Sequence, residues 1–349
     1  MGVTAEGRFP TPIAISMGDP AGIGLEVCLK AWSQRRERSL PPFVVFADPG
    51  ALAERGRQIG LPVPLQNIGT LSEAVDVFTT ALPVRPVPLA TRSTPGVPNP
   101  ANVAAVITAI EQATAAVVAG EAIALVTNPI AKSVLAASGF AYPGHTEFLA
   151  ALAQRHFSGQ HFHAVMMLAS RELRVVPLTI HIPLADVPKA ITRKSIIETA
   201  RITFEALKRD FAIATPRIAI AGLNPHGGED GTMGDEERNI IAPAIADLRN
   251  EGLVVTGPHP ADTLFHPAVR DRYDAVIAMY HDQALIPFKT IAFDHGVNVT
   301  LGLPFVRTSP DHGTAFDIAA QACASPQSLI ESLCLAAQIA AARTASQPK

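Results

Sequence analysis

The feature that most constrains the fold of this chain is an alternation of short β-branched runs with longer helical stretches. The runs are almost continuously apolar, which is typical of strands buried on both faces of a parallel sheet. Such an alternation predicts a mostly parallel sheet with helices on both of its faces. Strands are expected at residues 13–16, 43–47, 122–127, 164–168, 174–180, 217–221, 253–256 and 274–279.

Longer helical stretches are expected between the strands. Residues 83–100 contain six prolines, a composition that favours an irregular connection. The helices are expected at residues 25–32, 102–118, 146–155, 192–209, 235–249, 314–321 and 327–342.

Charge and cysteine content exclude several classes of protein. A net charge of −3 argues against a nucleic-acid binder that relies on a basic face. Three cysteines without CxxC spacing exclude a disulfide scaffold and a zinc ribbon, and they fit a reducing cytosol. Because no run reaches the roughly 20 apolar residues of a membrane span, we expect a cytoplasmic protein with no membrane partner.

Histidines follow three of the predicted strands. His181 comes directly after strand 174–180, His226 soon after strand 217–221, and His281 soon after strand 274–279. Ligands of open α/β sheets bind beyond the carboxyl ends of the strands, so these side chains are expected at one edge. Imidazole is a common ligand of divalent metals. Either a metal site assembled by the fold or ordinary polar strand ends explains the pattern.

Two glycine-rich segments follow predicted strands. Residues 224–237 contain four glycines and form either a loop that wraps an anion or metal, or a plain surface loop. The turn over residues 18–24 departs from the dinucleotide fingerprint GxGxxG, because Val27 stands where a small residue is expected. A tight turn from strand to helix beside a ligand cleft explains this second segment better.

Polar residues also occur where they suit an anion. Thr146 can cap the apolar helix that starts after Gly144, and a helix N-terminus attracts anions. Lys289, Asn298 and Arg307 lie in or beside a glycine-containing apolar stretch. Cations in such surroundings suit phosphate or carboxylate binding, with ordinary surface charge as the alternative.

Several long motifs resemble one known family in consistent order from about residue 12 to residue 342. The family is 4-hydroxythreonine-4-phosphate dehydrogenase of vitamin B6 synthesis. The motifs are MGDPAGIG (17–24), VTNPIAKSVL (126–135), PGHTEFLA (143–150), GLNPHGGEDGTMG (222–234), PADTLF (260–265), MYHDQALIPFK (279–289) and GVNVTLGLPFVRTSPDHGTAFDIA (296–319).

The resemblance implies an isocitrate/isopropylmalate-dehydrogenase-like fold with two α/β domains and the active cleft between them. Residues 1–129 plus 296–349 would form the first domain, on the cofactor side. Residues 130–295 would form the second, with the metal ligands and the dimer interface. The family is homodimeric, and the two subunits share ligands at each site.

The resemblance further implies oxidation of a small phosphorylated hydroxy-amino acid with NAD or NADP and a divalent metal such as Zn, Mg or Co. The substrate 4-phosphooxy-L-threonine gives 2-amino-3-oxo-4-phosphooxybutanoate. This product loses CO2 to become 3-amino-2-oxopropyl phosphate, a precursor of pyridoxine 5′-phosphate.

Carried over motif by motif, the resemblance assigns roles to individual residues. The catalytic base is left open between Lys289 and Asp262, since both lie in matched motifs. The proposed metal ligands are His181, His226 and His281; the substrate residues are His145, Thr146, Lys289, Asn298 and Arg307; the cofactor residues are Asp311, His312, Gly313 and Thr314.

Other functions compete with this interpretation. A related dehydrogenase of 4-phospho-erythronate, phosphothreonate or a cis-dihydrodiol would share the chemistry of the cleft. A metal-dependent phosphohydrolase would also use histidine and aspartate clusters with phosphate-binding cations. A non-catalytic binding module would need no clustered metal ligands.

Overall fold

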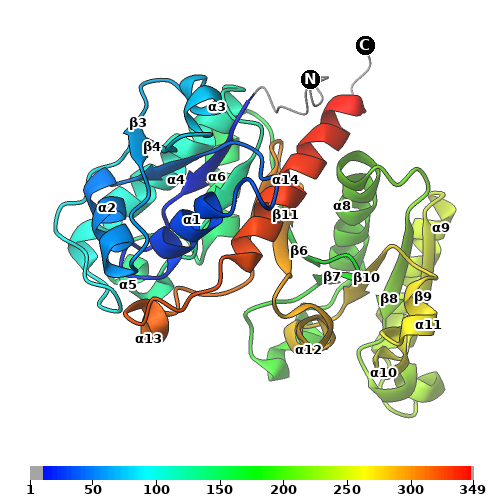
Figure 1. The fold of residues 1–349 in the computed structure, drawn as a ribbon. Helices are drawn as coiled ribbons and strands as arrows, with labels where there is room; N and C mark the ends of the chain where they lie inside the picture. The colour runs from blue at the N-terminus through cyan, green and yellow to red at the C-terminus, as the bar shows by residue number, and fades with distance from the viewer. Residues whose placement is uncertain (1–10, 347–349) are drawn as a thin grey trace. The chain divides into compact units, whose positions relative to one another are not determined.

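The structure, a computed structural model, describes residues 11–346. The chain divides into two compact units, and Figure 1 shows helices and strands in both. Unit 1 is Met1–Ala164 with Leu303–Lys349, and unit 2 is Val165–Gly302. The α/β class predicted from the sequence is confirmed.

The strands of unit 1 run parallel in the order β3-β4-β2-β1-β5-β12. Every residue of β1, β2 and β5 is buried, as expected for strands covered on both faces. Their bounds are β1 Ile13–Ser16, β2 Phe43–Ala47, β3 Leu65–Asn67, β4 Leu82–Pro86, β5 Leu125–Thr127 and β12 Arg307–Pro310.

Helices α4 and α14 both contact β1 and β5, while α6 packs on α4 and α1 packs on α14. Residues Pro100–Val118, which include α4, are long and apolar enough to span a membrane, but 56% of that segment is buried against the rest of the unit. We therefore interpret α4 as a core helix. The bounds are α1 Gly24–Ser33, α2 Pro49–Gln58, α3 Glu73–Val77, α4 Val103–Val118, α5 Lys132–Ala137, α6 His145–His156, α13 Phe316–Ala319 and α14 Gln327–Ala345.

Unit 2 has the strand order β11-β6-β7-β10-β8-β9. Strands β7, β10, β8 and β9 are parallel, whereas β6 is antiparallel to both of its neighbours. Strand β11 runs in the same direction as these four, so the carboxyl ends of five strands lie at one edge. The bounds are β6 Val165–Ala169, β7 Arg174–Pro177, β8 Arg217–Ala221, β9 Val254–His259, β10 Ala275–Ala278 and β11 Val297–Leu301.

Helix α12 covers the core of unit 2 with Ala284, Phe288 and Ala292, which are spaced four residues apart and fully buried. Ile286, on the opposite side of α12, is 64% exposed, and Phe293, directly after the helix, is 72% exposed. The helices of this unit are α7 Val187–Ala190, α8 Arg193–Phe211, α9 Ala242–Asn250, α10 Ala261–Leu264, α11 Pro267–Arg270 and α12 His281–Ala292.

The boundaries of the two units differ from the predicted domain boundaries. Residues 130–164, predicted in the second domain, belong to unit 1, because α6 packs on α4 and Arg155 lies 3.6 Å from Glu111. Strand β11, predicted in the first domain, belongs to unit 2, because it pairs with β6 along its whole length.

The predicted irregular connection at residues 83–100 is partly wrong. It starts inside β4, a parallel strand that contains Pro83 and Pro86. Here the carbonyl of Val84 accepts from Ile68, while the N–H groups of Leu82 and Val87 donate. The two prolines therefore need not donate to the ladder, which removes the usual objection to proline in a strand.

Candidate functional site

Two of the three predicted metal ligands lie together at the carboxyl edge of unit 2. Beyond β7 and β10, the N–H of Leu178 donates to Ala278 O, and the Thr179 hydroxyl donates to Met279 O. These bonds continue the pairing of β7 with β10 beyond the ends of both strands. The segments that carry His181 and His281 therefore lie side by side at this edge. The rings of His181 and His281 have centroids 5.8 Å apart.

The third predicted ligand, His226, lies in the glycine-rich loop that follows β8. Its φ of 54° is left-handed, and so are the φ angles of the next four residues. In the described part of one chain, no group of three or more histidine, cysteine or acidic side chains could hold a metal ion. Within a single chain, His226 therefore does not complete a three-ligand set with His181 and His281.

A buried carboxylate that the sequence analysis missed holds this loop in place. Glu237 Oε1 accepts from the backbone N–H groups of Leu223 and Asn224 at 2.7 Å each. Its Oε2 accepts from Asn224 Nδ2 at 2.9 Å. A Cβ on Gly228 would lie 2.7 Å from the same oxygen, so only glycine fits there. The local sequence does not distinguish Glu237 from the acidic residues directly before it, Asp235 and Glu236.

Replacing Glu237 by glutamine should lower the free energy of unfolding by about 2 kcal/mol. The new amide would place a donor against Asn224 Nδ2, and the backbone donors would lose a charged acceptor. Denaturant unfolding of unit 2 within the full chain measures this, with the exposed Glu229→Gln in the same loop as the control. Equal stability of the two variants would contradict the role of Glu237.

The remaining predicted residues of unit 2 occupy separate elements. Lys289 is half-buried on α12, with Nζ 5.5 Å from the ring centroid of Phe293. Asp262 is exposed in the first turn of α10. Asn298 lies on β11 opposite Leu168. From the sequence, Lys289 was expected in or beside a glycine-containing stretch, and α12 was not predicted.

Unit 1 gathers predicted anion-binding residues around the start of α6. Arg307, on the first residue of β12, is only 3% exposed, and its Nη2 donates to Thr127 Oγ1 at 2.6 Å. Burial lowers the pKa of Arg307 to about 10, partly offset by the negative charge of Glu147. His145 and Thr146 form the first turn of α6, whose N-terminus favours an anion.

One ring nitrogen of His145 is buried at the start of α6. This atom, Nε2, has no hydrogen-bond partner among the described residues. Burial first, and then the charges of Arg307 and Lys132, lower the pKa of His145 well below 6.5. Lys132, at the start of α5, was not predicted as a site residue, although it lies in the quoted motif at residues 126–135. An anion is the partner that these groups suit.

His145 should make the protein less stable as the pH falls. Its pKa is lower in the folded than in the unfolded state, so the stabilisation is present above 6.5 and is lost as the pH falls through the folded pKa. Denaturant unfolding at pH 7.5 and 5.5 should show a smaller difference for His145→Asn than for the parent. One such group contributes at most about 1.4 kcal/mol per pH unit. An identical loss of stability between pH 7.5 and pH 5.5 in both proteins would show that His145 is not its cause.

The four predicted cofactor residues form an irregular segment between β12 and α13. The N–H of Asp311 donates to Ser328 Oγ at 3.2 Å, and His312 Nδ1 lies 3.0 Å from Gly313 O. The carbonyl of Thr314 accepts from the N–H of Ile23, in the turn that follows β1. That turn also buries Asp19, whose pKa burial raises.

The sequence matches a known protein family over most of its length. The model of the pyridoxal phosphate biosynthetic protein PdxA family matches residues 39–336. The chain belongs to this family. The resemblance stated from the sequence is thereby confirmed.

Relatives in this family are similar along their whole length. The 4-hydroxythreonine-4-phosphate dehydrogenase of Xanthobacter autotrophicus is 53% identical over 95% of this chain and 94% of the relative. The enzyme of the same name from Bradyrhizobium diazoefficiens is 51% identical over 95% and 98%.

Solved structures agree with this assignment. The 4-hydroxythreonine-4-phosphate dehydrogenase of Klebsiella pneumoniae is 39% identical, with a TM-score of 0.84 over 95% of this chain and 99% of that one. A terephthalate 1,2-cis-dihydrodiol dehydrogenase from Burkholderia xenovorans is 30% identical, with a TM-score of 0.61 over 94% and 98%.

Proposed function

We propose that the protein oxidises 4-phosphooxy-L-threonine with NAD+ or NADP+ in vitamin B6 synthesis. The observation that carries the proposal is the buried Arg307 guanidinium beside the buried ring nitrogen of His145 at the start of α6, which together suit the anionic group of a phosphorylated substrate. Family membership supports the reaction, because relatives at 53% and 51% identity are named 4-hydroxythreonine-4-phosphate dehydrogenase. A cytoplasmic location is part of the proposal.

The donor set of unit 2 fits a divalent metal. Two imidazole rings lie together at a strand edge, and imidazole nitrogen suits zinc and cobalt. His181 and His281 would hold the ion, with His226 supplied by a second copy of the chain. A shared site agrees with the lack of a three-ligand group in the described residues of one chain. Exposed Ile286 on α12 and Phe293 directly after it supply apolar surface suited to a dimer.

The residues of the chain have separate roles in substrate binding and proton transfer. Arg307, His145 and the N-terminus of α6 bind the anionic group, and Lys289 and Asn298 add polar contacts. Lys289 or Asp262 accepts the hydroxyl proton as the hydride passes to the nicotinamide, which gives the ketone, NAD(P)H and H+. When bound, the metal lowers the pKa of the substrate hydroxyl and stabilises negative charge on that oxygen. The keto acid then loses CO2.

Residues Asp311, His312, Gly313 and Thr314 would lie along the dinucleotide. The backbone bond between Thr314 and Ile23 places this segment beside the turn after β1. Ligands of parallel sheets bind at such strand ends. This placement supports a nucleotide site in unit 1.

The deciding experiment measures absorbance at 340 nm with purified protein, each dinucleotide and each candidate substrate. We expect NAD(P)H to form with 4-phosphooxy-L-threonine faster than with 4-phospho-erythronate, phosphothreonate or a cis-dihydrodiol. The diol is included because of the 30% identical terephthalate dihydrodiol dehydrogenase. Release of inorganic phosphate without dinucleotide reduction would replace the proposal with a phosphohydrolase.

A further inference from the structure

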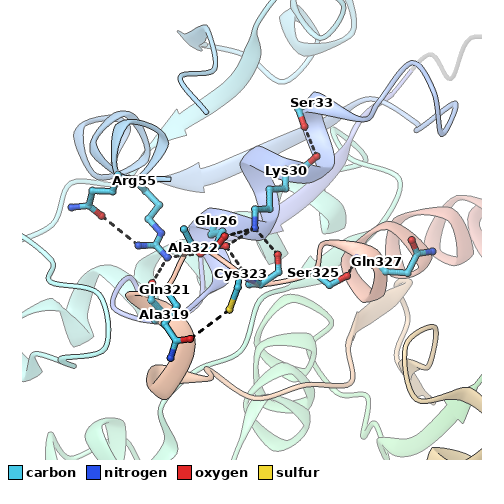
Figure 2. A network of polar contacts seen from close by, with 12 residues as sticks. Glu26, Lys30, Ser33, Arg55, Ala319, Gln321, Ala322, Cys323, Ser325 and Gln327 are labelled. Carbon is cyan, nitrogen blue, oxygen red and sulfur yellow. Dashed lines mark hydrogen bonds and ion pairs between the residues drawn. The ribbon is translucent and has the colours of Figure 1, made fainter. Parts of the chain in front are cut away.

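A buried carboxylate outside the substrate and metal residues joins α1, α2 and the chain that follows α13. Glu26, in the first turn of α1, is 0% exposed. It accepts hydrogen bonds from Lys30 Nζ at 2.7 Å, from the Ala324 N–H at 3.0 Å, and from Arg55 Nη2 (Figure 2). Burying a carboxylate costs solvation energy, and pairing with cations often does no more than compensate for that cost. A contribution to stability therefore explains the buried Glu26 poorly.

The two cations also bind backbone carbonyls of one short segment. Lys30 Nζ donates to Ala322 O at 3.0 Å and to Ala324 O at 2.8 Å, and Arg55 Nη2 donates to Ala319 O. Residues 320–326 form neither helix nor strand. Ala322 has a φ of 58°, a left-handed conformation that alanine adopts at a cost. Side chains from α1 and α2 therefore hold the conformation of this segment.

The same stretch of chain is held at its upstream end by the turn after β1. The N–H of Ile23 donates to Thr314 O at 3.1 Å, and a Cβ on Gly22 would come within 2.8 Å of that oxygen. Only glycine permits this close approach. Residues 314–324 are thus fixed at both ends to one strand-to-helix connection and its helix.

Arg55 also borders a pocket within unit 1. The pocket has a volume of about 310 Å³ and lies at the carboxyl ends of β1, β2 and β4, with Leu25, Asp48 and Thr91 among its lining residues. Ligands of parallel sheets bind at such ends. The Arg55 side chain therefore contacts Glu26, the last residue of α13 and the wall of a pocket.

We propose that Glu26 is a positioning residue for the dinucleotide. Through Lys30 and Arg55 it sets the conformation of residues 314–324, against which NAD(P)+ lies. The inference rests on the proposed function, which assigns residues 311–314 to the cofactor. Since Glu26 is fully buried, it touches neither substrate nor dinucleotide and acts only through these neighbours.

The test is Glu26→Gln in the full-length protein, with calorimetric titration of NAD+ and NADP+ and steady-state kinetics. We expect Kd and KM for the dinucleotide to rise about tenfold, because the amide is a weaker acceptor for both cations. The KM for the phosphorylated substrate and kcat should stay within about twofold. Lys30→Met should shift the same two constants, and Lys30→Arg should largely preserve them. Lys30→Met also serves if Glu26→Gln does not fold.

The control is Glu111→Gln, which removes a half-exposed carboxylate 3.6 Å from Arg155 in the same unit. Hydrogen exchange over residues 319–324 should accelerate in Glu26→Gln and not in this control. Unchanged dinucleotide Kd in both test variants, or an equal loss in kcat and both KM values, overturns the inference. If the parent binds a dinucleotide without oxidising the substrate, the Kd comparison still decides it and only the proposed function fails. A parent that binds neither dinucleotide overturns both.

Discussion

Replacing His281 by alanine should lower kcat/KM about a thousandfold or more and release the bound metal. His281 is the first residue of α12, and its ring neighbours that of His181. The loss of one of the three proposed ligands should remove most of the affinity for a divalent ion. Elemental analysis of the dialysed protein and initial rates with added Zn, Mg or Co measure the two effects.

The fold should survive this change. The His281 side chain is 37% exposed, and its Nδ1 lies 2.7 Å from Oδ1 of the exposed Asp282, a surface contact of small value. Helix α12 still packs through Ala284, Phe288 and Ala292. The control is His295→Ala, which removes a partly exposed histidine 3.2 Å from Glu172 in the same unit and should retain full activity. Full metal content and normal turnover in His281→Ala would remove this residue from the metal site.

Apolar runs predicted much of the sheet because burial on both faces leaves a strong local signal. Strands β1, β2 and β8 begin and end at the predicted residues. Strand β4 was missed, because proline is a poor local indicator when the ladder does not need its N–H. Helix α12 was missed as well. It contains Pro287, which argues against a helix in the sequence, and its buried face is evident only from the core that it covers.

The candidate site was predictable to the extent that its residues belong to recognisable motifs. His181 and His281 follow neighbouring parallel strands, so strand order brings them together. Glu237 and Glu26 could not be selected from other acidic residues by composition. Their roles depend on backbone N–H groups and carbonyls that only the fold brings near them. Lys132 lies in a quoted motif, but its effect on the pKa of His145 is electrostatic and depends on the approach of its side chain to Gly144, directly before α6.

Replacing Arg307 by methionine should raise the KM for the phosphorylated substrate about a hundredfold and leave the KM for the dinucleotide nearly unchanged. Charge-assisted hydrogen bonds to a phosphate are worth about 1.5–3 kcal/mol each, and the guanidinium offers several donors. The pKa of Arg307, lowered to about 10, reflects the burial of its charge away from water. Because little water surrounds the guanidinium, its attraction for an anion is only weakly screened. Arg307→Lys should recover only part of the loss, because an ammonium lacks the planar fork.

The matched control is Arg155→Met, which removes an exposed cation from the far end of α6 and should leave both KM values within about twofold. The Arg307→Met protein without ligand should be at least as stable as the parent, because burying the guanidinium costs solvation energy that the charge of Glu147 offsets only in part. Phosphate should then stabilise the parent against heating more than it stabilises the variant. Equal stabilisation of both by phosphate would mean that Arg307 is not part of the anion site. Reduced stability of the ligand-free variant would point instead to a purely structural pairing with Thr127.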